Sequence, residues 1–304
     1  MINNKFKNKN SFKPKKITEA ERRFIKAEKA YGAKSQEKKQ KEALAKTKSI
    51  NSYERIQKVL AAAGKGSRRE IERLIENGDI KVNGNIAKLG DRINLSEKPK
   101  IYIKNNLVRI SFTKEKTCRV LAYHKPEGVI SSNGDPDGRE TIFDKVPYIK
   151  GGKWINVGRL DINTSGLLLF TNDGELANKL MHPRSNIDRI YLVRIFGNVT
   201  NEILENLTTG VYVDGETLKF KSIKKQGGTG INQWYEVVLS EGKNREIRRL
   251  VESQELSVSR LIRIEYAGIK LTREIKKGKF VELKTKEVNS LRKLVSLEEI
   301  TYSY

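Results

Sequence analysis

The sequence predicts an α+β protein, in which a small helix–helix–hairpin unit precedes a larger domain with a largely antiparallel mixed sheet flanked by helices. Residues 52–95 change from helical periodicity to short strand-like runs around a turn. From Arg119 onward, strand-like runs are separated by loops or short helices rather than by regular crossovers. This order favours an α+β domain over a doubly wound parallel sheet.

The chain carries a large excess of positive charge. Its 304 residues have a formal net charge of +24, with 37% apolar and 32% charged residues. Such an excess indicates a polyanionic partner, most often nucleic acid and less often an anionic membrane. No run of about 18 apolar residues predicts a transmembrane helix, and MINNKFKNKN lacks the apolar segment of a signal peptide. The single cysteine, Cys118, leaves no disulfide or cysteine-based zinc site within one chain, which fits a cytoplasmic protein.

Residues 1–51 are expected to form a basic, disordered extension. Residues 1–50 contain 16 Lys or Arg and five Asp or Glu. A polar helix within residues 18–45 is an alternative, but little apolar surface is available to dock it. The functional alternative is a basic arm that gains order on RNA. In that case deleting residues 1–50 weakens RNA binding and its salt dependence, with turnover on saturating substrate largely unchanged.

The small unit is expected at residues 52–100. SYERIQKVLAAAG has apolar residues at helical spacing and stops at Gly64, a typical C-terminal cap. Ser67 and Glu70 have the spacing of a capping box at the start of a second helix. IKVNGNIAKLGDRI then predicts short strands around an Asn83-Gly84 turn. Four basic side chains near the helix start and the turn are candidates for phosphate binding: Arg68, Arg69, Arg73 and Lys81.

A linker rich in Lys, Asn and Thr is expected from about Lys98 to Lys116, with a strand-like run at 107–112. The larger domain, residues 117–304, follows. Its expected strands are RVLAYHKP, YLVRIFG, QWYEVVL, LIRIEYAGI and GKFVELKT, and its expected helices are TNDGELANKLMHP, capped near Asn172 or Asp173, and NREIRRLVESQ. The glycine-rich segment 227–230 is interpreted as a hairpin connection.

Several enzyme classes are disfavoured by the residues available. The only histidines are His124 and His182, and no HExxH motif or Cys/His cluster predicts a zinc hydrolase. Neither GxxxxGK[ST] nor a GxGxxG after a strand is present, so we expect no nucleotide cofactor and no metal. The remaining candidate is Asp161 in GRLDINTSGLLLF, since carboxylates act as nucleophiles or general bases. From the triplet alone, a turn residue or an ion-pair partner is the commoner explanation.

Two segments carry a resemblance to known families. VLAAAGKGSRREIERLIENGDIKVNG with LGDRI, within residues 53–95, resembles the small RNA-binding domain named after ribosomal protein S-four. GRLDINTSGLLLFTNDGEL resembles the signature of RNA pseudouridine synthases that carry this domain at the N-terminus. HKPEGVISS, RIYLVRIFG and EGKNREIRRL also occur in the family's order, so the resemblance covers about residues 53–285. It implies the family's fold and activity.

The resemblance implies roles for five residues. It places the catalytic aspartate at Asp161, and at Arg159 the arginine that fills the space left by the flipped nucleotide. Tyr191 matches the aromatic residue that stacks on the target uracil. Arg248 matches the basic residue that pairs with the catalytic carboxylate, and Ile247 packs beside the base. The structural alternatives are a phosphate contact for Arg159, a core tyrosine for Tyr191 and a solvated helix face for Arg248.

Details of the motifs indicate a branch of the family. EGKNREIRRL resembles the synthases acting on large-subunit (23S) rRNA more than the small-subunit enzyme. Val157 stands before GRLD where another branch has His, and Arg189 stands where Lys is usual, with a different donor geometry. The resemblance implies isomerisation of a specific uridine. It leaves open whether Asp161 acts as a nucleophile or as a base. The implied partner is large-subunit rRNA or a pre-ribosomal particle, without membrane or DNA, and a monomer is the default.

Two alternatives to this function are kept. One is a non-catalytic RNA-binding protein of ribosome assembly that has the fold without the reaction, and the other is a synthase acting on small-subunit rRNA. The joint presence of Asp161, Tyr191 and Arg248 favours an enzyme, because a passive RNA-binding protein has no need of all three.

Overall fold

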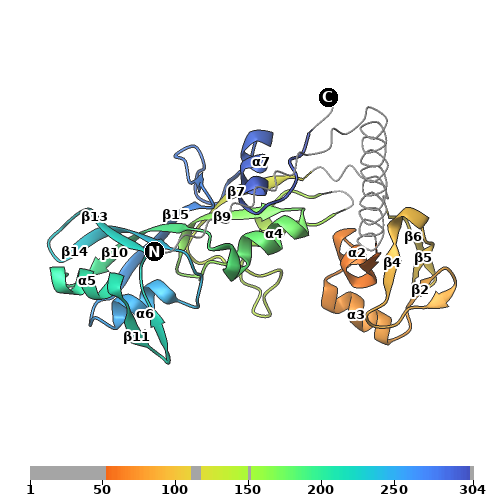
Figure 1. Ribbon diagram of the computed structural model, residues 1–304, viewed down its shortest axis with the longest axis horizontal. Helices are drawn as coiled ribbons and strands as arrows, with labels where there is room; N and C mark the ends of the chain where they lie inside the picture. The colour runs from red at the N-terminus through yellow and green to blue at the C-terminus, as the bar shows by residue number, and fades with distance from the viewer. Residues whose placement is uncertain (1–52, 111–117, 150–151, 302–304) are drawn as a thin grey trace, which may run out of the picture.

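The computed structural model describes residues 53–110, 118–149 and 152–301. The extension predicted at 1–51 and the end of the predicted linker lie outside these ranges. Within them the chain forms a small N-terminal unit and a larger, elongated one (Figure 1). A contact between the two units is the hydrogen bond that Lys153 Nζ donates to the Gly66 carbonyl at 3.2 Å.

The small unit packs two helices on a four-stranded antiparallel sheet of order β3-β2-β5-β6, and a further pair, β1 and β4, is also antiparallel. Its elements are β1 Tyr53–Arg55, α2 Ile56–Ala62, α3 Arg68–Glu76, β2 Ile80–Val82, β3 Asn85–Ile86, β4 Arg92–Asn94, η1 Leu95–Glu97, β5 Ile101–Ile103 and β6 Asn106–Val108. The buried apolar side chains that join helices to strands are Ile56, Val59, Leu60, Ile71, Ile75, Ile80, Ala87, Ile93 and Ile101.

Local sequence signals in this unit are confirmed. The Ser67 hydroxyl accepts a hydrogen bond from the Glu70 amide, and the Glu70 carboxylate accepts one from the Ser67 amide, which forms the predicted capping box. Asn83 and Gly84 both have positive φ, 50° and 91°, between β2 and β3. Two consecutive positive φ values are what a tight hairpin turn requires.

The linker predicted from Lys98 is wrong over its first part. β5 pairs with β2 and with β6, so residues 101–108 complete the sheet of the small unit. The run IYIKNNLV is a hairpin whose turn, Lys104-Asn105, also has positive φ values of 47° and 63°. Each of its strands is only three residues long. Strands this short leave little pattern in the sequence, so the composition of the segment resembled that of a linker.

The larger unit is built on a nine-stranded sheet of order β13-β14-β10-β15-β9-β7-β17, with β16 beside β15 and β8 beside β9. Neighbouring strands are antiparallel except β15 and β9, so the predicted mixed, largely antiparallel sheet is confirmed. The strands are β7 Val120–Lys125, β8 Ile155–Val157, β9 Ser165–Thr171, β10 Arg189–Phe196, β13 Ser222–Thr229, β14 Asn232–Leu239, β15 Ser257–Tyr266, β16 Ile269–Lys270 and β17 Phe280–Glu282.

Helices cover both faces of this sheet. α5 and α6 pack on one face through Leu207 and Leu250, whereas α4 and α7 pack on the other through Leu176 and Leu291. The remaining elements are α4 Gly174–Met181, α5 Asn201–Thr209, β11 Val211–Val213, β12 Glu216–Leu218, α6 Glu246–Glu252, α7 Thr285–Leu294, η2 Ile142–Lys145 and η3 Pro183–Ser185. β9 lies between both layers, so all seven of its residues are buried, as its unbroken apolar run predicts.

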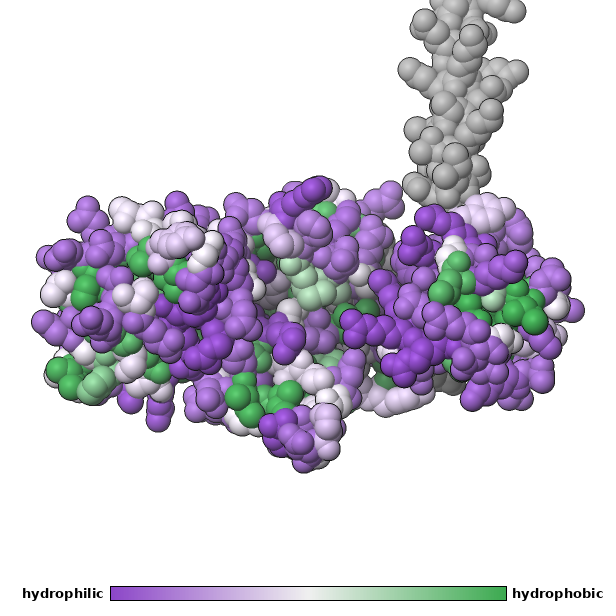
Figure 2. All heavy atoms as spheres, turned by 90° about the horizontal axis from the view of Figure 1, so that it is seen from below, coloured by the Kyte–Doolittle hydropathy of each residue, from purple (hydrophilic) through white to green (hydrophobic). Residues whose placement is uncertain are grey.

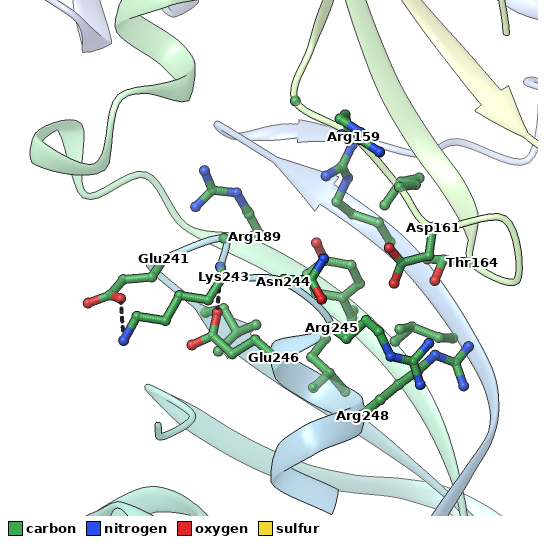
Figure 3. Close-up of a pocket in the computed structure, with 18 of the residues that line it drawn as sticks. Arg159, Asp161, Thr164, Arg189, Glu241, Lys243, Asn244, Arg245, Glu246 and Arg248 are labelled. Atoms are coloured by element: carbon green, nitrogen blue, oxygen red, sulfur yellow. Dashed lines mark hydrogen bonds and ion pairs between the residues drawn. The ribbon is translucent and has the colours of Figure 1, made fainter. Parts of the chain in front are cut away.

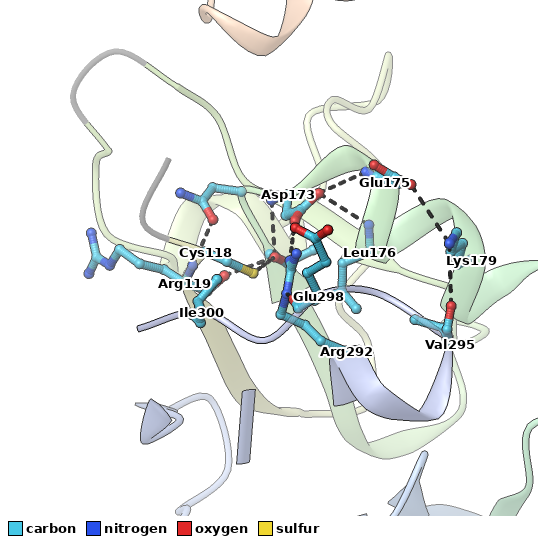
Figure 4. Close-up of polar contacts among 12 residues, drawn as sticks. Cys118, Arg119, Asp173, Glu175, Leu176, Lys179, Arg292, Val295, Glu298 and Ile300 are labelled. Atoms are coloured by element: carbon cyan, nitrogen blue, oxygen red, sulfur yellow. Dashed lines mark hydrogen bonds and ion pairs between the residues drawn. The ribbon is translucent and has the colours of Figure 1, made fainter. Parts of the chain in front are cut away.

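A polar network fixes α7 against α4 on one face of the sheet (Figure 4). Asp173 caps α4 by accepting hydrogen bonds from the Glu175 and Leu176 amides, which confirms one of the two predicted caps. Arg292 of α7 donates to the same carboxylate at 2.6 Å and to the Glu298 carbonyl. A charge-assisted bond between partly buried groups therefore ties the C-terminal helix to the cap of α4.

On the face seen in Figure 2, hydrophilic side chains dominate and apolar ones form small separate groups. Across the residues that the structure describes, no helix is both long and apolar enough to cross a membrane.

Candidate active site

A pocket of about 480 Å³ opens where four parts of the larger unit meet. They are the loop between β8 and β9, the start of β10, the segment entering α6, and the middle of β15. The lining side chains include six basic and three acidic ones, so the pocket is positively charged: Arg159, Arg189, Lys243, Arg245, Arg248 and Arg263 against Asp161, Glu241 and Glu246. Such a surface suits an anionic ligand.

The loop that carries Asp161 is held in place by hydrogen bonds from a buried lysine. Lys125, at the end of β7, is fully buried and donates from Nζ to the carbonyls of Asp161 at 3.1 Å and Thr164 at 2.9 Å. It also contacts the carbonyls of Pro126 and Ile162. Burial lowers the pKa of Lys125 to about 8, although the nearby Asp161 charge acts in the opposite direction. One ammonium therefore satisfies several loop carbonyls at once.

The other end of the loop is fixed by a serine and a glycine. The Ser131 hydroxyl donates to the Leu160 carbonyl at 2.7 Å and accepts from the Leu160 amide at 3.2 Å. Gly158 turns the chain out of β8 with a φ of 79°, a conformation that other residues rarely adopt. Leu160 is buried, and its backbone is held by Ser131. Its neighbours in sequence, Arg159 and Asp161, are therefore attached to a fixed residue.

The Asp161 carboxylate is turned into the pocket, between Arg159 on one side and Arg245, at the N-cap of α6, and Arg248 of α6 on the other (Figure 3). Its side chain makes no hydrogen bond or ion pair with any residue that the structure describes, while its backbone carbonyl is engaged by Lys125 and Thr164. A half-exposed carboxylate without such partners is available to a ligand.

Arg248 does not form the direct ion pair with Asp161 that the resemblance implies. Within the described ranges its guanidinium donates to the carbonyls of Asn163 at 3.0 Å and Val258 at 3.1 Å. Burial lowers the pKa of Arg248, with Arg245 adding to the effect and Asp161 opposing it. The two carbonyls fix the guanidinium beside the loop, so Arg248 acts on the carboxylate through space and by tethering Asn163.

The other three residues predicted for the site also line the pocket. Tyr191 on β10 and Ile247 on α6 both line the pocket and are mostly buried, at 8% and 4% exposure. Arg159 is exposed and makes no hydrogen bond or ion pair with the described residues. The structure thus brings all five residues predicted for the site into one pocket, two as apolar walls and one as a free cation.

Sequence reasoning missed Lys125 and Arg263. Both are nearly fully buried cations at strand positions that point inward. A charged residue at an inward position of a strand pattern is a detectable signal, because lysine and arginine are rarely buried without a partner. Neither stands out in the sequence, because one cation within the strand-like runs RVLAYHKP and LIRIEYAGI does not interrupt the pattern that predicts a strand.

The four basic residues predicted in the small unit do not form one patch. Arg68, Arg69 and Arg73 are exposed on α3 and make no hydrogen bond or ion pair with the described residues. Lys81 lies between the core-facing Ile80 and Val82 on β2, so it is on the sheet face away from α3. Its Nζ donates to the Asn105 side chain at 3.2 Å.

The described ranges contain no group of three or more His, Cys, Asp or Glu side chains that could hold a metal ion. His124 is occupied by a hydrogen bond of 2.9 Å between its Nδ1 and the Ile275 carbonyl, which agrees with a structural role.

Comparisons with known proteins agree with this arrangement. A family model described as RNA pseudouridylate synthase matches residues 119–253, and one described as S4 domain matches residues 54–98. The chain is 54% identical over 244 residues to "Ribosomal large subunit pseudouridine synthase B" of Haemophilus influenzae, covering 80% of this chain and 68% of that protein. The protein of the same name from Escherichia coli strain K12 is 52% identical over 250 residues, covering 82% and 86%.

A third relative and a solved structure extend the comparison. "Ribosomal large subunit pseudouridine synthase B" of Yersinia pestis is 50% identical over 250 residues, covering 82% of this chain and 79% of that protein. A structure described as "Crystal structure of pseudouridylate synthase" superposes with a TM-score of 0.54 at 25% identity, covering 78% of this chain and 99% of that chain.

Proposed function

Because the chain belongs to the RNA pseudouridylate synthase family, we propose that it isomerises a specific uridine of large-subunit ribosomal RNA to pseudouridine, with Asp161 as the catalytic carboxylate. The observation that carries the proposal is the unpartnered Asp161 carboxylate in a pocket with Tyr191 and Arg248. The printed name shared by the three relatives supports the large-subunit target. The enzyme works in the cytoplasm as a monomer, with rRNA or a pre-ribosomal particle as its partner and neither DNA nor a membrane.

The reaction conserves the atoms of the nucleotide. The bond between N1 of uracil and C1′ of ribose breaks, the base rotates, and a bond forms between C5 and C1′. The C5 proton leaves and N1 gains a proton, so no oxidant or reductant is required. Asp161 either attacks C1′ or removes a proton, and both roles need a carboxylate that is fixed in position and free of competing partners. The Lys125 and Ser131 contacts supply the fixed position.

The pocket walls match an extruded base. A uridine within a helix has to leave the stack before its C1′ can be reached. Tyr191 offers one ring face for stacking and Ile247 an apolar wall, while the exposed Arg159 fills the space that the base leaves. Arg248 keeps the loop and its carboxylate in place through Asn163. The exposed arginines of α3 add phosphate contacts outside the pocket.

Pseudouridine mapping of ribosomal RNA tests the proposal. Purified protein is incubated with protein-free large-subunit rRNA, with assembly intermediates and with small-subunit rRNA, and modified positions are mapped against reactions without protein. We expect one or a few new pseudouridines, in large-subunit rRNA only. New pseudouridine confined to small-subunit rRNA would overturn the target, and no new pseudouridine in any of these RNAs would overturn the enzymatic function in favour of a non-catalytic assembly protein.

A further inference from the structure

Arg263 is a buried cation in the pocket lining that the roles described so far do not use. Its side chain is 2% exposed, and its Nε donates to the Leu167 carbonyl at 2.7 Å. Nη2 is buried and has no hydrogen-bond partner in the described parts of the chain. An unsatisfied buried donor carries a free-energy cost, which is larger when the donor is charged. A partner supplied by the substrate would remove that cost.

The backbone fixes this guanidinium beside the proposed base site. Arg263 on β15 is in register with Tyr191 on β10 and with Gly166 on β9, so the three residues form a row across the sheet. Paired residues of neighbouring strands point to the same face, which explains why Tyr191 and Arg263 line the same pocket. Gly166, at the base of the Asp161 loop, has no side chain, and a Cβ there would collide with the Arg263 backbone.

An aromatic ring holds the guanidinium in place without neutralising it. The Arg263 Cζ lies 5.0 Å from the centre of the Tyr266 ring, and the Arg189 Cζ lies 5.2 Å from the same centre. Neither arginine forms an ion pair with an acidic side chain of the described residues. Cation–π contacts leave the N–H donors of arginine free for a further acceptor.

We propose that Arg263 donates a hydrogen bond to a carbonyl oxygen of the extruded uracil and stabilises the negative charge on the detached base. This inference rests on the proposed pseudouridine synthase function. Of the parts of the target nucleotide, the flat base reaches deepest into a pocket, whereas phosphates stay near solvent, and Arg263 is nearly fully buried. Uracil presents two carbonyl acceptors, O2 and O4, to a side chain that has donors only.

The charge on the base explains why a cation is suited to this position. When the N1–C1′ bond breaks, its electron pair stays on uracil and is shared with O2 and O4, until the C5–C1′ bond forms and N1 gains a proton. A fixed donor aimed at an oxygen where charge develops stabilises that state more than the ground state. Arg263 therefore acts on the chemical step, whereas its effect on overall RNA affinity is small.

Sulfur substitution in the substrate tests the contact without disturbing the fold. Large-subunit rRNA fragments carry uridine, 2-thiouridine or 4-thiouridine at the position that the wild type modifies, and single-turnover rates are measured. Sulfur is a weaker hydrogen-bond acceptor than oxygen, so we expect one thio-substitution to slow the wild type about ten-fold, the loss of one charge-assisted hydrogen bond. Arg263→Met should be about 100-fold slower on uridine and no longer sensitive to that sulfur.

Matched variants separate contact from structure. Arg189→Met removes the other arginine that contacts the Tyr266 ring. This variant should be slowed by thio-substitution of the substrate as much as the wild type is. Arg263→Lys keeps a cation but not the planar fork, and we expect it to remain slow and insensitive to sulfur. RNA dissociation constants should stay within about three-fold of wild type for both Arg263 variants.

The outcomes distinguish this inference from the proposed function. If the wild type forms pseudouridine but neither thio-substitution changes its rate by more than about two-fold, Arg263 does not contact a base carbonyl. An equal sulfur effect in Arg263→Met and the wild type contradicts the inference as well. If the wild type forms no pseudouridine on any RNA, the proposed function itself is wrong.

Discussion

The small unit and the pocket of the larger unit use positive charge in opposite ways. The side chains of Arg68, Arg69 and Arg73 are exposed and have no hydrogen-bond or ion-pair partner among the described residues. In the larger unit, Lys125 behind the Asp161 loop and Arg263 in the pocket lining are buried, and both donate hydrogen bonds to backbone carbonyls. Exposed charges attract a polyanion without fixing its position, whereas buried ones define one geometry at a cost in desolvation. We therefore expect substitutions of the exposed arginines to change RNA binding, and substitutions in and around the pocket to change the chemical step or the stability of the fold.

The largest effect is expected from Asp161→Asn. The substitution removes the nucleophile or base, so single-turnover formation of pseudouridine should slow by about 10³-fold or more. Because the Asp161 side chain has no partner among the described residues, the free energy of unfolding should change by less than about 0.5 kcal/mol. RNA affinity should remain close to wild type. Asp137→Asn, at an exposed surface ion pair with Arg139, is the control and should leave the rate unchanged.

Gly166→Ala should be the most destabilising single substitution tested. The new Cβ would clash with the Arg263 backbone and would hold a φ of 112°, so the free energy of unfolding should fall by about 3 kcal/mol or more. Gly158→Ala is matched, because Gly158 also has positive φ but open space around it, and about 1 kcal/mol is expected. Both free energies of unfolding are measured by urea denaturation. If the two variants lose equal stability, Gly166 is needed for its positive φ and not for the close approach of β9 and β15.

Lys125→Met should destabilise the protein and change the pH dependence of stability. Several loop carbonyls lose their donor, which should cost about 2 kcal/mol at pH 7. The pKa of Lys125 is about 8 when folded and near its ordinary 10.5 when unfolded. Between pH 8 and pH 10.5, Lys125 is mostly protonated in the unfolded chain and mostly neutral in the folded one. The contribution of Lys125 to the free energy of unfolding therefore rises with pH in this range.

The pH test compares the two proteins, so that other titrating groups cancel. The difference in free energy of unfolding between wild type and Lys125→Met should widen from pH 8 to 10, by on the order of 1 kcal/mol per pH unit. A difference that stays flat or narrows with pH would mean that Lys125 keeps its ordinary pKa.

The smallest effects are expected in the small unit. Replacing Arg68, Arg69 and Arg73 together by alanine should weaken RNA binding about ten-fold at moderate salt and reduce the salt slope by about three. Turnover on saturating RNA and the free energy of unfolding should be nearly unchanged. Arg69→Ala and Lys81→Ala compare the two faces of the unit. An equal loss of affinity would show that RNA contacts both faces of the unit rather than the α3 face alone.

Local features of the fold were predictable because neighbouring residues determine them. Ser67 with Glu70 forms the capping box, Asn83-Gly84 forms the hairpin turn, and Asp173 caps α4. β5 was missed, and β6 was anticipated only as a strand-like run at 107–112 inside the linker. β5 pairs with β2, about 20 residues away in sequence, and β6 pairs with β5. A three-residue strand carries too little periodicity to be recognised without its partner.

The candidate site shows the same limit. The residues Asp161, Arg159, Tyr191, Ile247 and Arg248 came from a resemblance between motifs, and the structure brings them into one pocket. The partner of Arg248 could not be read from sequence, because it depends on where the carbonyls of Asn163 and Val258 lie. Arg263 was missed for a related reason. Its alignment with Tyr191 depends on an irregularity in β15 that leaves Ile264 without a partner on β10.

By itself, the sequence determined the charge, the caps and turns, the order of the strands along the chain and the family to which the motifs belong. All of these depend on residue type and on spacings of a few residues. Only the tertiary structure decided which cations are exposed and which are buried, and that Tyr191, Arg263 and Gly166 share one row beneath the Asp161 loop. Such proximity arises from strand register, and register is fixed by the packing of both sheet faces rather than by any local signal.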